Sequence, residues 1–202
     1  MNFSKTTIAL IAAACLLGVH GCSTYNSLVT ESEGVDQAWA KVENQYQRRL
    51  DLIPNLVNTV KGYAKHESET LGSVTAARAG LTQAYNNAND LKEGANVSEE
   101  TLNNYAQAQA ELNRALSIYV NAVHEAYPDL KADKNFQDLQ VQLEGTENRI
   151  STERTYYTET VQAYNVAVRR FPANVWAGIF GFASKPQFKA EEQAKTAPKV
   201  EF

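Results

Sequence analysis

Apolar residues recur every three or four positions along most of the chain, which is the spacing of one face of an α-helix. The first apolar stripe runs from Val35 to Tyr63 and continues more weakly beyond it. A second stripe covers residues 102–126 and includes Gln109, and a third covers residues 136–171. No segment alternates with a period of two, so we expect an all-α protein without strands.

Residues that favour turns and helix ends separate these stripes. Residues 86–96 are rich in Asn, Asp and Gly, which predicts a loop. Ser98, followed by two glutamates, is typical of a helix start. Pro128 ends the second helix because proline disfavours helical backbone in the residue before it, and Pro172 ends a third helix that begins near Asp133.

The three regions differ in length, which constrains how they pack. A straight first region would be ~90 Å long, against ~45 Å and ~55 Å for the other two, so its stripe could not all be covered. Pro54 removes one backbone hydrogen bond and predicts a kink near residues 51–54. A further break near Gly72 or Gly80 supplies a fourth segment, and the fold class is an antiparallel up-and-down bundle of about four segments.

The amino terminus has the features of an export signal. Lys5 is followed by an apolar run from Ile8 to Leu17, which is shorter than the roughly 20 residues that span a bilayer core. Gly21, Cys22 and the polar chain after them resemble a bacterial lipobox cleaved before Cys22, with Cys15 as a weaker competitor. The alternative is an uncleaved anchor with an unmodified Cys22 thiol, and both forms place the rest of the chain outside the cytoplasm.

Four regions follow from these observations. Residues 1–21 form a signal peptide, and residues 22–34 contain the lipidated Cys22 and the membrane-proximal start of the first helix. Residues 35–183 form the bundle, and residues 184–202, which lack a core stripe, are expected to be disordered. A bacterial lipoprotein carries two or three acyl chains, which is sufficient for stable membrane anchoring.

Composition excludes several classes of function. The formal net charge is −4, from 19 basic and 23 acidic residues, so the chain has no excess positive field and we expect no nucleic-acid binding. Three His and two Cys cannot build a cysteine-rich metal cage or a disulfide framework. His66–Glu67 and His124–Glu125 begin like a zinc-protease motif, but neither has a second histidine four residues after the first. We therefore expect no metal, no cofactor and no catalytic residue.

Polar residues on the apolar stripes are the candidate site. Glu147 and Arg154 lie in line with Ile150 on the third stripe, so burial would leave two charges that need partners. One interpretation is a structural polar layer that fixes the helix register, and the other is a small pocket for a ligand or a partner's terminus. A cavity of several hundred Å³ at these residues would favour the pocket. The predicted polar cluster consists of Arg48, Arg49, Asp51, Asn55, Glu147, Asn148 and Arg154.

A dense series of motifs covers nearly the whole exported chain. It comprises YNSLV at 25–29, AWA at 38–40, QYQRRLDLIPNLV at 45–57, VKGYA at 60–64, EAYPDLK at 125–131, TENRI at 146–150 and FP at 171–172. Together these motifs resemble the LemA family. The resemblance implies a membrane-anchored helical bundle that faces away from the cytoplasm, in a family without an established catalytic activity. Two departures are Thr158, where the family tends to have Asn, and Cys22 in place of a single membrane-spanning anchor.

Residues 172–182 are unusually apolar and aromatic for so short a segment, and Trp176, Ile179 and Phe180 can share one helical face. Three environments are open to them: the side of their own bundle, a protein partner, or the membrane interface, where tryptophan is enriched. A mostly buried Trp176 would indicate packing on the bundle.

Two functions from different classes remain. The first is a non-enzymatic scaffold of the cell envelope, tethered to a membrane at Cys22 and binding a protein partner or its own copies. The second is a ligand-binding or catalytic lipoprotein that uses the polar cluster. In either case the domain faces the periplasm if the host has an outer membrane.

Overall fold

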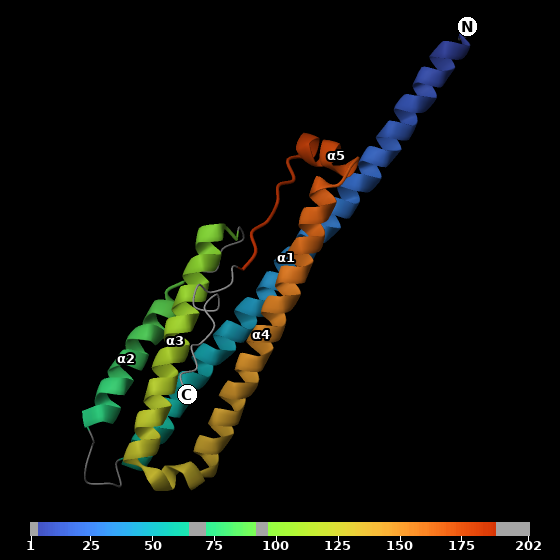
Figure 1. Ribbon diagram of the computed structural model, residues 1–202. Helices are drawn as coiled ribbons and strands as arrows, with labels where there is room; N and C mark the ends of the chain where they lie inside the picture. Colours follow the sequence, from blue (N-terminus) through green and yellow to red (C-terminus); the bar gives the residue numbers. More distant parts are fainter. Residues whose placement is uncertain (1–3, 65–71, 92–96, 189–202) are drawn as a thin grey trace, which may run out of the picture.

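The computed structural model describes residues 4–64, 72–91 and 97–188, and over these residues the chain is helical without strands. The predicted all-α up-and-down bundle is confirmed (Figure 1). In chain order the elements are α1 (Lys5–Ala64), α2 (Gly72–Asn89), α3 (Glu99–Ala126), the 3₁₀ helix η1 (Pro128–Ala132), α4 (Lys134–Arg169) and α5 (Ala173–Phe180).

The first helix begins well before its apolar stripe and includes Pro54. Pro54 lies inside α1, which runs without interruption from Lys5 to Ala64. Ile53 and Leu56 on either side of Pro54 are buried, and their packing offsets the one hydrogen bond that proline removes. The fourth segment begins at Gly72, which is one of the two predicted break points.

Two of the helix ends form as the capping residues indicate. The Ser98 hydroxyl accepts a hydrogen bond from the backbone N–H of Thr101 at 3.0 Å, and the Asp133 carboxylate accepts one from the N–H of Phe136 at 2.9 Å. Each cap satisfies an N–H group that the first helical turn leaves without a partner. α3 ends at Ala126, just before the Tyr127–Pro128 bond, as predicted.

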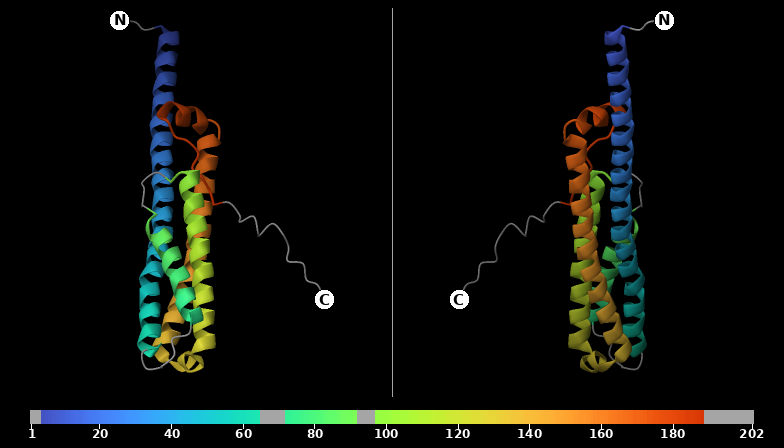
Figure 2. Two further views of the ribbon diagram at one scale, coloured as in Figure 1. Left: turned by 90° about the vertical axis from the view of Figure 1, so that its left-hand side faces the viewer. Right: turned by 90° about the vertical axis from the view of Figure 1, so that its right-hand side faces the viewer.

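The helices pack as two pairs with two separate buried clusters. α1 lies along α4, and α2 lies along α3 (Figures 1 and 2). Near the η1 turn, all four long helices enclose an apolar cluster that we call the distal core. The proximal core lies nearer the N-terminus of α1, between α1 and α4. The proximal core contains Leu28, Val35, Ala38, Trp39, Val42, Tyr46, Leu102, Tyr105, Ile150, Tyr157, Val161, Tyr164, Val168 and Ala177.

The segment after α5 returns along the bundle and covers the proximal core. We call residues 182–188 the strap. Its Phe188 ring lies 5.4 Å from the ring of Tyr157 and 6.0 Å from that of Trp39. The Tyr157 hydroxyl donates a hydrogen bond to the carbonyl oxygen of Pro186 at 3.0 Å.

Polar bonds hold the middle of the strap at Lys185. Its backbone N–H donates to Asn165 Oδ1 at 2.8 Å, and Asn165 Nδ2 donates to its carbonyl oxygen at 2.8 Å. Its ammonium group lies 2.6 Å from the Asp36 carboxylate. The expectation that disorder begins at residue 184 is therefore corrected: residues 184–188 pack on the bundle, because pairwise bonds rather than a periodic stripe hold them. The remainder of that predicted tail, residues 189–202, lies outside the described residues.

Candidate functional site

Arg49 is the centre of the polar cluster. Its side chain is only 2% exposed and forms an ion pair with Glu147, whose side chain is 46% exposed. Arg49 also donates a hydrogen bond to Gln109 Oε1 at 3.0 Å, and Asn113 Nδ2 donates to the other carboxylate oxygen of Glu147 at 3.1 Å. The four side chains therefore connect α1, α3 and α4.

This cluster separates the two apolar cores. On α1, Arg49 lies between Tyr46 of the proximal core and Leu50 of the distal core. On α4, Glu147 occupies the same intermediate position between the two clusters. The arrangement is a polar layer that connects three helices of the bundle between the two apolar cores.

Burial governs the electrostatics of the layer. It lowers the pKa of Arg49 to about 10, an effect that Tyr46 opposes and Arg154 reinforces. Arg49 therefore remains cationic at neutral pH. Burial also raises the pKa of Tyr46, whose hydroxyl has no hydrogen-bond partner among the described residues.

The other predicted members of the cluster lie outside this layer. Arg48, Asp51, Asn55 and Asn148 are exposed to solvent. Arg154 is half-buried, and its guanidinium carbon lies 4.5 Å from the centre of the Phe188 ring. Of the seven predicted residues, the structure joins Arg49 and Glu147 by a direct bond.

The sequence contained a signal for one missed partner. Gln109 is a polar residue on the apolar stripe of the second helix, so its burial beside Arg49 follows the same logic that selected Glu147. Asn113 lies one turn further along the same helix, where nothing in the apolar pattern distinguishes it. The contact between Asn113 and Glu147 depends on how α3 and α4 meet.

An open groove of about 440 Å³ adjoins the outer side of this layer. Glu147, Arg154 and Phe188 line it, but none of the residues from α1 does. The volume of the groove reaches the several hundred Å³ expected for a pocket, and Glu147 and Arg154 of the predicted cluster line it, whereas the cluster residues on α1 do not. A ligand in this groove would meet α4 and the strap rather than Arg49.

Metal and proton chemistry have little support in the described part of the chain. No group of three or more His, Cys, Asp or Glu side chains there has an arrangement that could hold a metal ion. His124 contacts Gln140 through its Nε2 at 3.2 Å and packs against the Phe136 ring. Burial and the nearby Lys131 lower the pKa of His124, while His66 lies outside the described residues.

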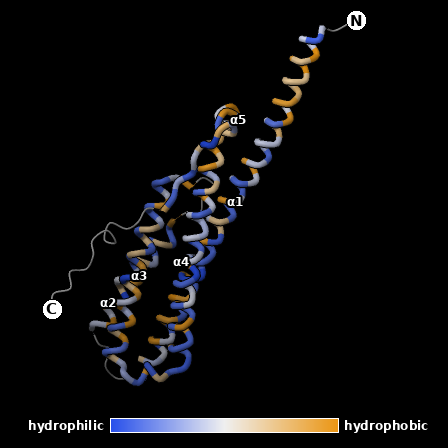
Figure 3. The backbone as a smooth tube through the Cα atoms, turned by 45° about the vertical axis from the view of Figure 1, so that its right-hand side comes forward, coloured by the Kyte–Doolittle hydropathy of each residue, from blue (hydrophilic) through white to orange (hydrophobic). Residues whose placement is uncertain are grey.

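The amino-terminal part of α1 projects beyond the bundle. We call residues 5–20 the arm; its large apolar side chains are exposed, with Leu16 at 72% and Leu10 at 71%, whereas Leu28 further along the same helix is buried. Figure 3 shows the arm as a largely hydrophobic stretch that extends past the end of α5. Within the described residues α1 is long and apolar enough to cross a membrane, a test that a signal sequence also passes. Cys22, just after the arm, is exposed.

Trp176 of α5 lies against α1 at Gly21. A Cβ atom on Gly21 would lie 2.9 Å from a ring carbon of Trp176, so a larger residue fits there only if the ring moves. The Trp176 ring is also stacked on Phe180. Trp176 is half-buried, which differs from the mostly buried side chain expected for full packing on the bundle.

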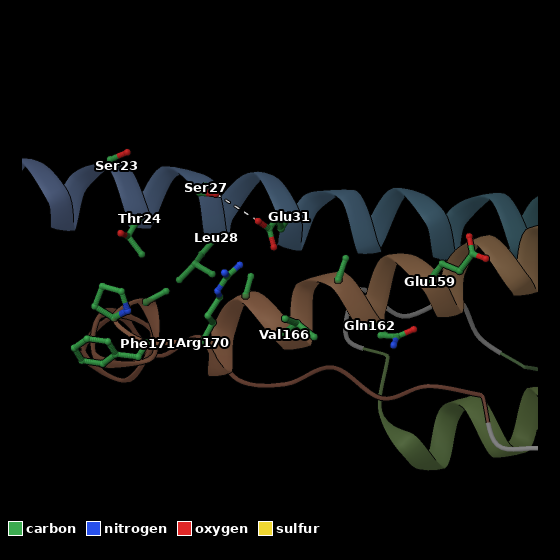
Figure 4. Close-up of a pocket in the computed structure, with 14 residues that line it drawn as sticks. Ser23, Thr24, Ser27, Leu28, Glu31, Glu159, Gln162, Val166, Arg170 and Phe171 are labelled. Atoms are coloured by element: carbon green, nitrogen blue, oxygen red, sulfur yellow. Dashed lines mark hydrogen bonds between the residues drawn. The ribbon is translucent and has the colours of Figure 1, made fainter.

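A larger groove opens between α1 and α4 next to Cys22 (Figure 4). It has a volume of about 870 Å³, and we call it the anchor-side groove. Leu28 and Val166 contribute apolar surface to it, whereas Glu31, Glu159 and Arg170 bring charges of both signs. The groove between α1 and α4 therefore has both apolar and charged surface.

Comparisons with known proteins agree with the motifs in the sequence. Residues 38–202 match the LemA family model. Two proteins of Paramagnetospirillum magneticum, Magnetosome protein MamQ 1 and Magnetosome protein MamQ 2, are each 26% identical to this chain over 185 residues. The alignments cover 85% of this chain and 67% of each relative. The family match begins after Cys22, so the anchoring of this chain is argued from its own residues.

Proposed function

Because the chain belongs to the LemA family, we propose that it is a cell-envelope protein tethered to a membrane at Cys22, with a helical bundle that acts as a non-enzymatic scaffold. The arm is the observation that carries this proposal. Its apolar side chains are exposed, whereas the apolar face of the same helix is buried from Leu28 onward. Such a surface either enters a bilayer or belongs to a signal that is removed at the membrane.

Lipidation at Cys22 is the anchoring mode that we favour. Cys22 is exposed, and it follows the arm at the level where α1 joins the bundle. Cleavage before it would remove the arm and leave acyl chains at this end of the bundle. The domain would then face the periplasm in a host with an outer membrane.

A scaffold role is supported by how the polar layer is built. The bonds of Arg49 to Glu147 and Gln109 connect α1 to α4 and α3, which supports a structural role for these side chains. Exposed apolar side chains on the bundle, including Ile118 and Val141, offer contact points to a partner or a second copy. A binding lipoprotein is the second candidate, and the anchor-side groove of about 870 Å³ favours it.

The anchoring is tested by expressing the full chain in a bacterial host and measuring the mass of the mature protein. We expect a chain that begins at Cys22 and carries a diacylglyceryl group and an additional acyl chain. Cys22→Ala should abolish the lipid mass and leave an uncleaved precursor, whereas the control Cys15→Ala should mature normally. A mature wild-type protein that keeps residues 1–21 and a free Cys22 thiol would establish a membrane span instead.

The scaffold role is tested by photo-crosslinking in intact cells. A photoreactive amino acid at Val141, which is exposed on α4, should give adducts of discrete mass with a partner or a second copy. The same probe at Val166, which lines the anchor-side groove, distinguishes the second candidate. Adducts confined to Val166 would favour binding in the groove over a scaffold surface.

A further inference from the structure

The end of the bundle next to Cys22 carries a second apolar surface, separate from the arm. We call residues 171–180 the cap; it consists of Phe171, Pro172 and α5. Phe171 is 79% exposed and Ile179 is 65% exposed, and Val175 and Phe180 are also exposed. Large apolar side chains gathered on one short segment mark a contact surface rather than random exposure.

The other face of the cap is fixed to α1. The Tyr25 ring, which cleavage before Cys22 would retain, meets the Phe180 ring edge-on with 4.9 Å between centroids. Trp176 also lies on Gly21 as long as residues 1–21 are present. Ala177 is buried against the proximal core. α5 is therefore held at the level of Cys22 while its outer apolar face remains uncovered, as the position of α5 beside the base of the arm in Figures 1 and 3 illustrates.

We propose that the cap lies on the lipid surface of the membrane, beside the anchor at Cys22. This inference rests on the proposed anchoring. The level of Gly21 and Cys22 is where a bilayer begins in both anchoring modes, because either acyl chains on Cys22 or the arm itself enters the lipid there. The exposed face of the cap is held at that level against α1, so it lies closer to the lipid than to soluble proteins.

Basic residues lie next to the cap, although the chain as a whole has a net charge of −4 and the adjoining anchor-side groove also contains Glu31 and Glu159. Arg169 and Arg170 directly precede Phe171. Basic residues next to aromatic side chains, here the exposed Phe171 and the half-buried Trp176, are typical of segments that lie in the interface of anionic membranes.

Because the protein is already anchored, the small apolar surface of the cap is sufficient for membrane contact. A free eight-residue helix would bind a bilayer weakly, but α5 is already held at the membrane by the anchor, so its binding becomes intramolecular. Two attachment points then define the tilt of the bundle, which a single lipid anchor leaves free. The cap in this way sets which face of the scaffold a partner meets.

Trp176 provides a direct readout, because the other tryptophan, Trp39, is buried in the proximal core. The mature full chain is reconstituted into vesicles of phosphatidylethanolamine and phosphatidylglycerol whose acyl chains carry bromine, which quenches tryptophan fluorescence on contact. We expect strong quenching of the wild type. The cap variant Val175→Ser/Ile179→Ser should lose at least half of that quenching.

The matched control is Ile118→Ser/Val141→Ser, which changes two equally exposed apolar residues on α3 and α4; it should be quenched like the wild type. Wild-type protein that sediments with the vesicles without being quenched overturns the cap proposal and leaves the anchoring intact, as does equal quenching of the cap variant. Protein that does not sediment with vesicles overturns the anchoring itself. Crosslinking between two caps in the vesicles would assign this surface to a second copy and also overturn the proposal.

Discussion

The two ends of the bundle differ in the side chains that fill their apolar cores. The distal core is enclosed by four helices, and aliphatic residues such as Leu56, Leu81 and Leu112 fill most of it. The proximal core has α1 and α4 as its long walls, and large rings such as Trp39 and Tyr157 fill it. Here only the first part of α3, through Leu102 and Tyr105, still covers the α1–α4 pair, and aromatic rings and the strap fill the rest.

This difference makes the two cores depend on different parts of the chain. Most residues of the distal core lie on the periodic helical stripes, and Tyr127 and Leu130 of the turn after α3 complete it. The proximal core also needs the strap, which is more than 140 residues from Asp36 in sequence but bonds to it through Lys185. The polar layer at Arg49 lies at the boundary, so the two cores can be perturbed one at a time.

The largest effect is expected for Trp39→Ala. Trp39 is 4% exposed and contacts the rings of Tyr105, Tyr157 and Phe188. Its removal should lower the free energy of unfolding by about 4 kcal/mol through the cavity it leaves. Urea unfolding measures the loss, and hydrogen exchange at Lys185 should show that the strap opens with it.

Leu112→Ala is the matching change in the distal core. Leu112 is completely buried, and its truncation should lower the free energy of unfolding by about 3 kcal/mol. The strap makes no contact with this core, so hydrogen exchange at Lys185 under native conditions should remain as slow as global unfolding permits. Selective opening of the strap in this variant would mean that the two cores are one cooperative unit.

Arg49→Ala tests the boundary between the cores. The change leaves Gln109 and Glu147 without their shared donor, and we expect a loss of about 2 kcal/mol by urea unfolding. Glu147→Gln should have a smaller effect because the Glu147 side chain is half exposed. If Arg49→Ala is as stable as the wild type, the layer does not contribute to the fold and a binding role for Arg49 gains support.

Arg154→Ala separates the strap from the polar layer. A buried Arg154 with charged partners would be worth a few kcal/mol, as expected from its position on the apolar stripe. The structure instead places it over the Phe188 ring in a half-buried site, so the change should lower stability by about 1 kcal/mol. Phe188→Ala should make the Arg154→Ala change neutral in a double-mutant cycle, and a persistent effect would point to another partner.

Tyr157→Phe should have the smallest effect at neutral pH, about 1 kcal/mol, from the lost hydrogen bond to Pro186. Its pH dependence is more informative. Burial raises the pKa of Tyr157 to about 12, and Asp36 adds to the rise, whereas an unfolded tyrosine ionises near pH 10. The stabilising contribution of the neutral phenol is therefore complete below about pH 10 and is lost as the pH rises toward 12.

Urea unfolding at pH 8 and pH 11 measures this dependence. The wild type should lose more stability between the two values than Tyr157→Phe does. Tyr119→Phe is the corresponding variant in the distal core and should also reduce the alkaline sensitivity, since burial raises the pKa of Tyr119 to about 12 as well. A variant at either position with the full alkaline sensitivity of the wild type would show that its phenol ionises as freely in the fold as in the unfolded chain.

Local signals in the sequence predicted the parts of the fold that depend on neighbouring residues. Ser98 and Pro128 marked helix ends that the structure confirms. Charges on the third apolar stripe marked Glu147, with Arg49 among its candidate partners, and also Arg154, which lies over Phe188 instead. The strap was not predicted because Phe182 and Phe188, which pack against the proximal core, have no helical periodicity, and because single hydrogen bonds such as that of Asn165 to Lys185 hold the segment. The contact of Trp176 with Gly21 depends on the chain folding back over the whole bundle, which no local pattern encodes. Lipidation of Cys22 stays a prediction.

The continuity of α1 has a mechanical consequence. From Cys22 to Ala64 the helix is unbroken, and at 1.5 Å per residue it forms a rod about 65 Å long. If the Cys22 end of this helix is fixed at the membrane, a change in tilt of about 10° would move the Ala64 end sideways by about 11 Å. The turn at η1 would therefore move furthest when the tilt of α1 at the membrane changes. A partner bound at this turn would be displaced more than a partner bound near Cys22.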